Sequence, residues 1–197
     1  FKFPRYDKSV MLASCIYYLN KGFKNIPYKD SYMLPDTKKI EDYKTKYFDT
    51  PKKKIGICWE AGATNLREQL HRTLNIELFE DIINLENASV YSFQVNPSLD
   101  KYKKYPHLID LGSTFKSFDD TAGALKNLDT MITVDTSIAH LAGALGVKTY
   151  LILPYCADWR WFGNDKTTEW YDSVTIFKQT HSNSWNNVFQ EMLECLL

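Results

Sequence analysis

The chain has 197 residues, which is enough for one large domain or for one full domain with an additional segment. Its 24 basic and 24 acidic residues cancel to a formal net charge of zero, which excludes the strongly basic field typical of nucleic-acid-binding domains, so we expect no nucleic-acid partner. No apolar run approaches the roughly 20 residues of a membrane span and no signal peptide pattern is present, so we expect no transmembrane segment and a cytoplasmic location.

The N-terminal quarter of the chain differs in character from the rest. Apolar spacing predicts a helix over Lys8–Asn20, and a short polar helix is expected over Thr37–Tyr47 after an irregular passage rich in tyrosine and lysine. A polar break containing proline then separates a mostly helical or irregular segment, residues 1–50, from residues 51–197. Because the chain opens with Phe1 rather than methionine, we expect it to be a fragment of something longer.

From Lys54 onward, predicted strands and helices alternate. Strands are expected at Ile55–Trp59, Ser89–Gln94, His107–Asp110, Met131–Val134, Thr149–Leu153 and Ser173–Phe177. Helices are expected at Ile76–Leu85, from Asp119 or Asp120 to Leu128, at Thr136–Leu145 and at Ser184–Leu196. Strands separated by helical runs imply βαβ units, so we predict an α/β fold with a parallel sheet and helices on both faces.

The four cysteines, Cys15, Cys58, Cys156 and Cys195, lie far apart without a CxxC pair. We expect reduced and mostly buried thiols rather than disulfides or a zinc site. The sequence contains no HExxH, P-loop or GxSxG motif, and nothing in it argues for a bound metal.

The most informative stretch is Met131–Trp161, which predicts a strand, a polar turn, a helix that ends at Gly146, a second strand and an aromatic loop. Asp135–Ser137 stand where this helix begins, and such residues cap helix N-termini, whose N–H groups and positive dipole end attract anions. We therefore predict a phosphate-bearing ligand at the start of the helix. The alternative stays open that Asp135 is an ordinary N-cap and that His140 is a histidine that is solvated or satisfied within the core.

Each predicted strand of the sheet ends in polar or small residues. The first is followed by Glu60 and Gly62, the second ends at Gln94, and two later ones lead into Asp135–Ser137 and Asp158. Because the carboxyl ends of parallel strands meet along one edge, we expect these residues to form one ligand site. The turn at Glu60 is also open to a plainer interpretation, in which Gly62 only supplies an unusual backbone angle.

Two loops carry residues whose role the sequence leaves open. Arg67, His71 and Arg72 either belong to a solvated loop or pair with phosphate oxygens. The run Asp-Trp-Arg-Trp that ends at Trp161 either clamps its loop to the domain or forms the wall of a pocket for a base or sugar. We favour packing for Trp161 and Trp170.

The run Val134–Val147, VDTSIAHLAGALGV, with the ILP and DWRW that follow it, resembles the C-terminal half of heptosyltransferase-type glycosyltransferases. It is closest to the variants that are often fused to tetratricopeptide repeats. The resemblance covers essentially Lys54–Leu197, while residues 1–50 are similar, more loosely, to the passage leading out of the family's N-terminal domain. Weaker matches are IGICWEAG, His71–Leu74, Phe118–Ala122, Trp170–Tyr171 and Phe177–Gln179.

The resemblance implies a GT-B architecture, in which two Rossmann-like domains face each other across a cleft. Residues 51–197 would be the C-terminal domain, which holds the nucleotide-sugar donor, and residues 1–50 a remnant of the N-terminal domain and linker. The implied reaction is inverting, metal-independent transfer of a sugar to an unknown glycan, lipid or protein acceptor, with no bound cofactor. The helix start and a cation would stabilise the charge of the leaving diphosphate.

Residue roles also follow from the resemblance. Asp135–Ser137 would hold the donor diphosphate or sugar hydroxyls, and His140 would support that turn. Arg72 would meet phosphate charge, and Glu60 and Gln94 would line the cleft. The expected donor site comprises Asp135, Thr136, Ser137, His140, Arg72, Glu60, Gly62, Gln94, Asp158 and Trp159.

The chain departs from the family in two ways. The usual catalytic base comes from the N-terminal domain, of which this chain holds almost nothing, so we name no catalytic residue. Glu60 stands where many relatives have a small residue. The alternative functions are an idle module that binds a nucleotide or glycan, and a nucleotide-sugar epimerase. Where the N-terminal domain is missing, we expect the inner face of residues 1–50 to drive self-association.

Overall fold

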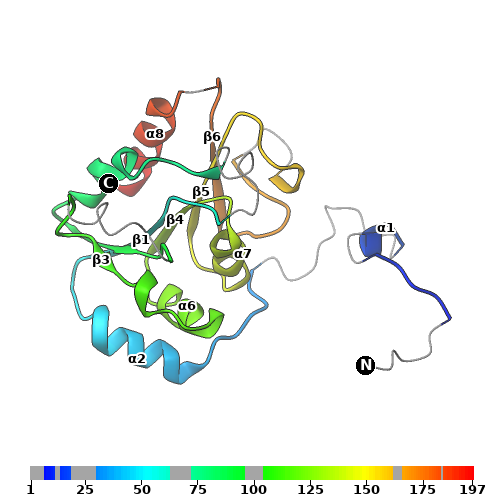
Figure 1. Ribbon diagram of the computed structural model, residues 1–197, viewed down its shortest axis with the longest axis horizontal. Coiled ribbons are helices and arrows are strands. Elements are labelled where there is room, and N and C mark those ends of the chain that lie inside the picture. The colour runs from blue at the N-terminus through cyan, green and yellow to red at the C-terminus, as the bar shows by residue number, and fades with distance from the viewer. Residues whose placement is uncertain are drawn as a thin grey trace.

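The computed structural model describes residues 7–11, 14–18, 30–62, 72–95, 104–161, 166–182 and 184–197. Six parallel strands form one sheet in the order β3-β2-β1-β4-β5-β6 (Figure 1). The prediction of an α/β, Rossmann-like parallel sheet with helices on both faces is confirmed. The strands are β1 (Lys53–Cys58), β2 (Ala88–Ser92), β3 (Ile109–Asp110), β4 (Thr130–Val134), β5 (Thr149–Leu153) and β6 (Val174–Lys178).

The strands β4 and β5 lie inside the sheet, and every residue of both is buried. Continuous burial is expected of a parallel strand that is covered on both faces. Successive side chains pack on opposite faces of the sheet, since Ile132 belongs to one core cluster and Met131 to another. The chain order reverses between β1 and β4, and in such sheets the crevice beyond the carboxyl ends at this point is the usual ligand site.

Helices cover both faces of the sheet (Figure 1). On one face, Phe79 and Phe189 meet with ring centroids 5.0 Å apart. On the other, Leu125 and Leu141 share a core cluster with Met131. The first face carries η3 (Ile76–Phe79), α4 (Glu80–Ile83) and α8 (Asn186–Leu196), and the second carries α2 (Thr37–Tyr47), α6 (Phe118–Leu125) and α7 (Ser137–Ala144).

Residues 30–50 contact the second face directly. The N–H groups of Tyr32 and Met33 donate to the carbonyl oxygen of Ala144 over 3.0 and 3.1 Å. Tyr43 and Phe48 are buried in the same core cluster as the α6 and α7 side chains. This segment therefore shares a hydrophobic core with the sheet, and its origin in another domain stays a prediction.

Two predicted helices differ from those observed. The helix expected from Asp119 or Asp120 instead has Ser117 as its N-cap, because the Ser117 hydroxyl accepts from the Asp120 N–H while the Asp120 carboxylate accepts from the Ser117 N–H. The helix expected at Ile76–Leu85 is divided into the 3₁₀ turn η3 and the short helix α4. In α7, the predicted left-handed stop is confirmed by Gly146, whose φ is +70°.

The helix predicted over Lys8–Asn20 is wrong for most of the part that the structure describes. Only α1 (Cys15–Tyr18) is α-helical, residues 7–11 have no helical structure, and the remainder falls outside the described residues. Val10, Met11 and Tyr18 are exposed, so the segment lacks the packing that an isolated short helix needs. None of the helices in the described ranges is both long and apolar enough to cross a membrane.

All four cysteines are free thiols. Cys58 is buried and Cys15 is half-buried, but Cys156 and Cys195 are exposed, so the expectation of mostly buried thiols is wrong for these two. Cys156 lies in the loop after β5, and Cys195 stands in the last turn of α8 beside the buried Leu196. Cys156 follows the apolar run of β5 and Cys195 precedes two leucines, which is why the local pattern did not reveal their exposure. The remaining short elements are η4 (Gly112–Thr114) and η5 (Trp159–Trp161).

Candidate functional site

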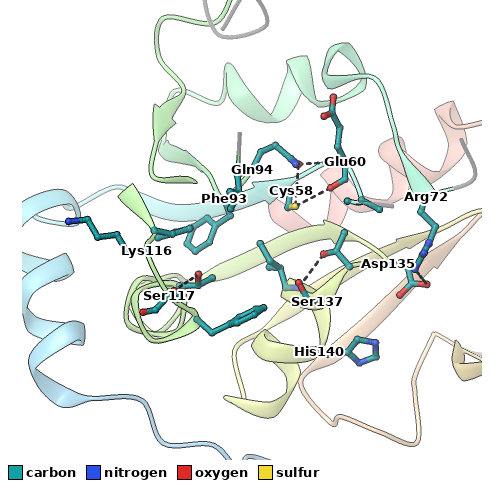
Figure 2. Close-up of a pocket in the computed structure, with 18 of the residues that line it drawn as sticks. Cys58, Glu60, Arg72, Phe93, Gln94, Lys116, Ser117, Asp135, Ser137 and His140 are labelled. Carbon is teal, nitrogen blue, oxygen red and sulfur yellow. Dashed lines mark hydrogen bonds and ion pairs between the residues drawn. The ribbon is translucent and has the colours of Figure 1, made fainter. Parts of the chain in front are cut away.

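A pocket of about 900 Å³ opens at the carboxyl ends of β1, β2 and β4, where the sequence predicts convergence (Figure 2). Its volume lies within the range of small-molecule sites. The structure brings most of the predicted donor-site residues to its wall, and only Asp158 and Trp159 stand outside. The predicted residues that line it are Glu60, Gly62, Arg72, Gln94, Asp135, Thr136, Ser137 and His140.

The turn between β4 and α7 presents a helix start to the pocket. Thr136 is the N-cap, and its hydroxyl accepts from the N–H of Ile138 over 3.2 Å. Within the described part of the chain, the N–H of Ser137 has no hydrogen-bond acceptor. Such first-turn N–H groups, together with the helix dipole, form a site for an anion. The interpretation of Asp135 as an ordinary N-cap is therefore wrong, because Thr136 already fills that position.

Asp135 faces Arg72 across the wall of the pocket (Figure 2). The Arg72 guanidinium nitrogen lies 3.9 Å from the Asp135 carboxylate, whose side chain is only 8% exposed. This distance is longer than a direct hydrogen bond, and among the described residues none donates a hydrogen bond to the carboxylate. A nearly buried carboxylate in this state has acceptor capacity left for the hydroxyl groups of a ligand.

The end of β1 is shaped by Gln94. Its side-chain oxygen accepts from the N–H of Glu60 over 2.9 Å and from the thiol of Cys58 over 3.4 Å. Gln94 is buried, so this amide fixes the turn while the residue contributes to the pocket wall. Burial also raises the pKa of the Cys58 thiol to about 12, which keeps it protonated and unreactive at neutral pH.

Gly62 contributes space rather than an unusual backbone angle. Among the described glycines only Gly146 has a positive φ, so the plain-turn interpretation, in which Gly62 supplies such an angle, is wrong. Among the residues that the structure describes, none lies within 4 Å of a Cβ atom at Gly62, so none of them covers the backbone here. The neighbouring candidates Arg67 and His71 lie outside the described residues.

His140 is half-buried and has a hydrogen-bond partner within the protein, so the interpretation as a histidine satisfied in the core stays open beside the functional one. Its ring stacks on Trp161, with centroids 5.0 Å apart, and its Nδ1 lies 3.1 Å from the hydroxyl of Tyr171. Burial lowers the pKa of His140; Asp135 opposes this effect. A half-buried, neutral imidazole at the pocket wall is a hydrogen-bonding group rather than a fixed charge.

The loop after β5 contributes a different residue from those predicted. Asp158 accepts from the backbone and guanidinium N–H groups of Arg160, and Trp159 is 58% exposed with the guanidinium over its ring. Arg160 is the residue of this loop that lines the pocket, and the sequence-based prediction missed it. Packing is confirmed for Trp161, which is 2% exposed, and Trp170 donates to the carbonyl of Arg160 over 2.8 Å.

The sequence-based prediction also missed the opposite end of the pocket. Phe93, Phe115 and Phe118 line it beside Lys116 and Ser117 (Figure 2). Phe118 is 64% exposed, which is costly for a phenylalanine and leaves its ring available for stacking. The capping pattern of Ser117 followed by an acidic residue three positions later was the available signal for a helix start at this edge.

No protein-family model matches the chain, and no curated protein matches its sequence. Its fold is similar to that of solved glycosyltransferases. ADP-heptose LPS heptosyltransferase II of E. coli aligns with a TM-score of 0.60 and 14% identity over 84% of this chain and 52% of its own. E. coli heptosyltransferase WaaC with ADP-2-deoxy-2-fluoro heptose aligns with a TM-score of 0.55 and 12% identity, over 92% and 53%.

A third similar structure is the family 9 glycosyl transferase of Veillonella parvula, with a TM-score of 0.53 and 12% identity over 82% of this chain and 46% of its own. The chain spans about half the length of each of these proteins. At such low identity the likeness shows the fold alone: the chain has the fold of about half of a heptosyltransferase-like GT-B protein. Its ligand and reaction have to be argued from the residues of the site.

Proposed function

We propose that this chain is the donor-binding half of a glycosyltransferase, which transfers a sugar from a nucleotide-diphosphate sugar to a glycan, lipid or protein acceptor. One observation carries the proposal. A nearly buried carboxylate, Asp135, a guanidinium, Arg72, and the N-terminal end of α7 meet in one pocket. These groups match the hydroxyls and the diphosphate of such a donor.

Each group has a distinct task in this proposal. The N–H of Ser137 and the positive end of α7 receive diphosphate oxygens, and Arg72 adds a cation beside them. Asp135 accepts hydrogen bonds from sugar hydroxyls. As the bond to the sugar breaks, negative charge grows on the diphosphate, and groups already aimed at that charge stabilise the transition state without a metal.

The two ends of the pocket suggest how the donor lies. Arg72, Asp135 and His140 form a charged and polar end, whereas Phe93 and Phe118 form an aromatic end (Figure 2). A nucleobase is a flat π-system that stacks on aromatic rings. The base would therefore lie over Phe118, with the diphosphate at α7 and the sugar beyond it.

The proposed reaction needs more than this half. An inverting transfer requires a base to deprotonate the acceptor hydroxyl, and the proposal assigns that base to the other domain of a GT-B enzyme. We expect the chain by itself to bind the donor without turnover. An idle binding module and a nucleotide-sugar epimerase remain outcomes of the experiment.

The test is a binding panel. ADP, GDP, UDP and CDP are titrated by calorimetry and thermal shift against the chain and against Asp135→Asn and Arg72→Gln. We expect one diphosphate to bind best. The nucleotide sugar with the same base is then titrated, and each substitution should weaken its binding by roughly tenfold or more, as for a lost charge-assisted hydrogen bond. Asp81→Asn, an exposed carboxylate on α4, is the matched control.

The outcomes separate the alternatives. No nucleotide binding at all overturns the proposal and the epimerase, and leaves only a module that binds a glycan. Binding by a form of the protein that includes the second domain, with no transfer to any acceptor, identifies an idle module. Conversion of a free nucleotide sugar without an acceptor identifies an epimerase.

A further inference from the structure

Four rings from four separate segments pack around the end of the pocket at His140. Tyr32 precedes α2, His140 is in α7, Trp161 ends η5 and Tyr171 precedes β6. The rings of His140 and Trp161 are nearly parallel, at 19°, whereas Tyr171 presents its edge to His140 at 63°. The rings of Tyr32 and Tyr171 stack at a centroid distance of 6.5 Å. We call these four residues the histidine stack.

The ring of Tyr171 packs directly against the backbone of α7 at Gly143, which has no side chain. A Cβ atom at Gly143 would lie 2.4 Å from Cγ of Tyr171, so the ring occupies the space that a side chain at this position would need. Tyr171 is buried, and its hydroxyl lies 3.1 Å from Nδ1 of His140. The hydroxyl is therefore held against one nitrogen of the imidazole by packing from several sides.

The state of the Tyr171 hydroxyl allows it to donate to Nδ1 of His140. Burial, and after it the neighbouring Tyr32, raise the pKa of the Tyr171 hydroxyl, which therefore keeps its proton. A protonated hydroxyl that donates to Nδ1 requires this nitrogen to be unprotonated, and a neutral imidazole then carries its hydrogen on Nε2. Within the described residues, Tyr171 is the hydrogen-bond partner of His140, so Nε2 remains for a ligand.

We propose that Tyr171 is a positioning residue, which holds His140 as the neutral Nε2–H tautomer so that this N–H is donated to an oxygen atom of the ligand in the pocket. The identity of that ligand rests on the function proposed above, whereas the tautomer does not. Asp135 and Asp158 favour the imidazolium and Arg160 opposes it, so charges of both signs face the ring. The tyrosine selects between the two neutral tautomers of the imidazole. A nearby charge acts mainly on the balance between the neutral ring and the imidazolium.

The first experiment reads the tautomer in the protein without ligand. The imidazole ¹⁵N chemical shifts of His140, assigned by their loss in His140→Gln, distinguish protonated from unprotonated nitrogen. We expect Nε2 protonated and Nδ1 unprotonated in the native chain, and a mixture of tautomers in Tyr171→Phe. Tyr150→Phe, which removes another buried tyrosine hydroxyl, bonded to the carbonyl of Cys195 over 3.1 Å, is the matched control and should change nothing at His140.

The native measurement alone is decisive. A hydrogen on Nδ1 in the native chain overturns the proposal whether or not any variant folds. An unchanged tautomer in a folded Tyr171→Phe protein overturns it as well, because the imidazole would then be set by something else.

The second experiment tests whether the Nε2–H group of His140 donates to the ligand. It measures the affinity for the diphosphate that binds best in the panel. Tyr171→Phe should weaken it by roughly two- to tenfold, the range for one hydrogen bond. In the His140→Gln background, where the glutamine amide donates without help, Tyr171→Phe should have little further effect. An equal loss in both backgrounds indicates a merely structural tyrosine and overturns the positioning role. If no diphosphate binds although the tautomer is as expected, the proposed function fails while the assignment of the tautomer stands.

Discussion

The carboxylate of Asp120 lies 2.6 Å from Nζ of Lys39, 81 positions earlier in the chain. The same carboxylate also accepts from the N–H groups of Lys116 and Ser117. It therefore closes the N-terminal cap of α6 and ties this helix to α2. Since α6 begins at the aromatic end of the pocket, this pair links the segment before the sheet to the site.

We expect Asp120→Asn to lower the free energy of unfolding by about 1–2 kcal/mol, because it weakens a capping box and leaves a lysine without its carboxylate. The Lys39 ammonium lowers the pKa of Asp120 below its ordinary value of 3.8. Burial acts in the opposite direction and has a smaller effect. A lowered pKa contributes stability above that ordinary value, and the contribution is lost as the pH falls through the folded-state pKa.

Urea unfolding at a series of pH values checks this prediction. The difference between the native chain and Asp120→Asn should be constant near neutrality and shrink in acid. Asp119→Asn, at the adjacent exposed carboxylate, is the control and should cost less. A difference that stays the same down to the lowest pH at which the chain folds would contradict the ionic account.

Gly143→Ala tests how α7 and Tyr171 fit together. The added methyl group would lie 2.4 Å from the tyrosine ring, so we expect a loss of about 1–3 kcal/mol from overpacking and a displaced Tyr171. Thermal unfolding measures the cost, and Gly62→Ala is the control because a Cβ atom there meets no described residue within 4 Å. Equal stability of the two variants would show that α7 or the tyrosine yields without strain.

The parts of the fold that the sequence predicts well are those encoded locally. In β4 and β5 every residue is apolar or β-branched, so each strand can be predicted from its own sequence. Gly146 likewise marks the end of α7. The convergence at one edge also follows from local signals, because parallel strands separated by helices leave little choice of topology.

The details of the site depend on contacts between distant segments and were therefore missed. Whether Arg160 or its neighbours Asp158 and Trp159 faces the pocket depends on how a three-residue turn packs. The partner of His140 is a tyrosine 31 positions away, which no local pattern identifies. Phe118 follows the cap at Ser117 and is 64% exposed at the pocket, which no local pattern of apolar residues predicts.

Thiol reactivity tests the floor of the pocket. In the folded chain at about pH 8, alkylation should modify the exposed Cys156 and Cys195 and leave Cys58 unmodified, because burial raises the pKa of this thiol to about 12. Mass spectrometry of peptides locates the label, and all four cysteines should react in denaturant. Rapid labelling of Cys58 in the folded chain would mean that the end of β1 opens to solvent.

The pH dependence of stability tests the surroundings of His140. Burial lowers the pKa of His140 below its ordinary value of 6.5, so folding favours the neutral imidazole. A group with a lowered folded-state pKa contributes stability above the ordinary value and loses it as the pH falls, because the unfolded chain then binds the proton more readily. Unfolding of the native chain should therefore become easier, relative to His140→Gln, as the pH is lowered through about 6.5.

The comparison depends on slopes and not on absolute stabilities, since the glutamine also changes the packing against Trp161. His107→Gln, at an exposed histidine beyond the pocket, is the control. The same titration in Tyr171→Phe should show a smaller slope, because removing the hydroxyl takes away a partner of the neutral ring. Identical slopes in all four proteins would mean that His140 is as solvated as it is in the unfolded chain, and the histidine stack would then have no influence on its protonation.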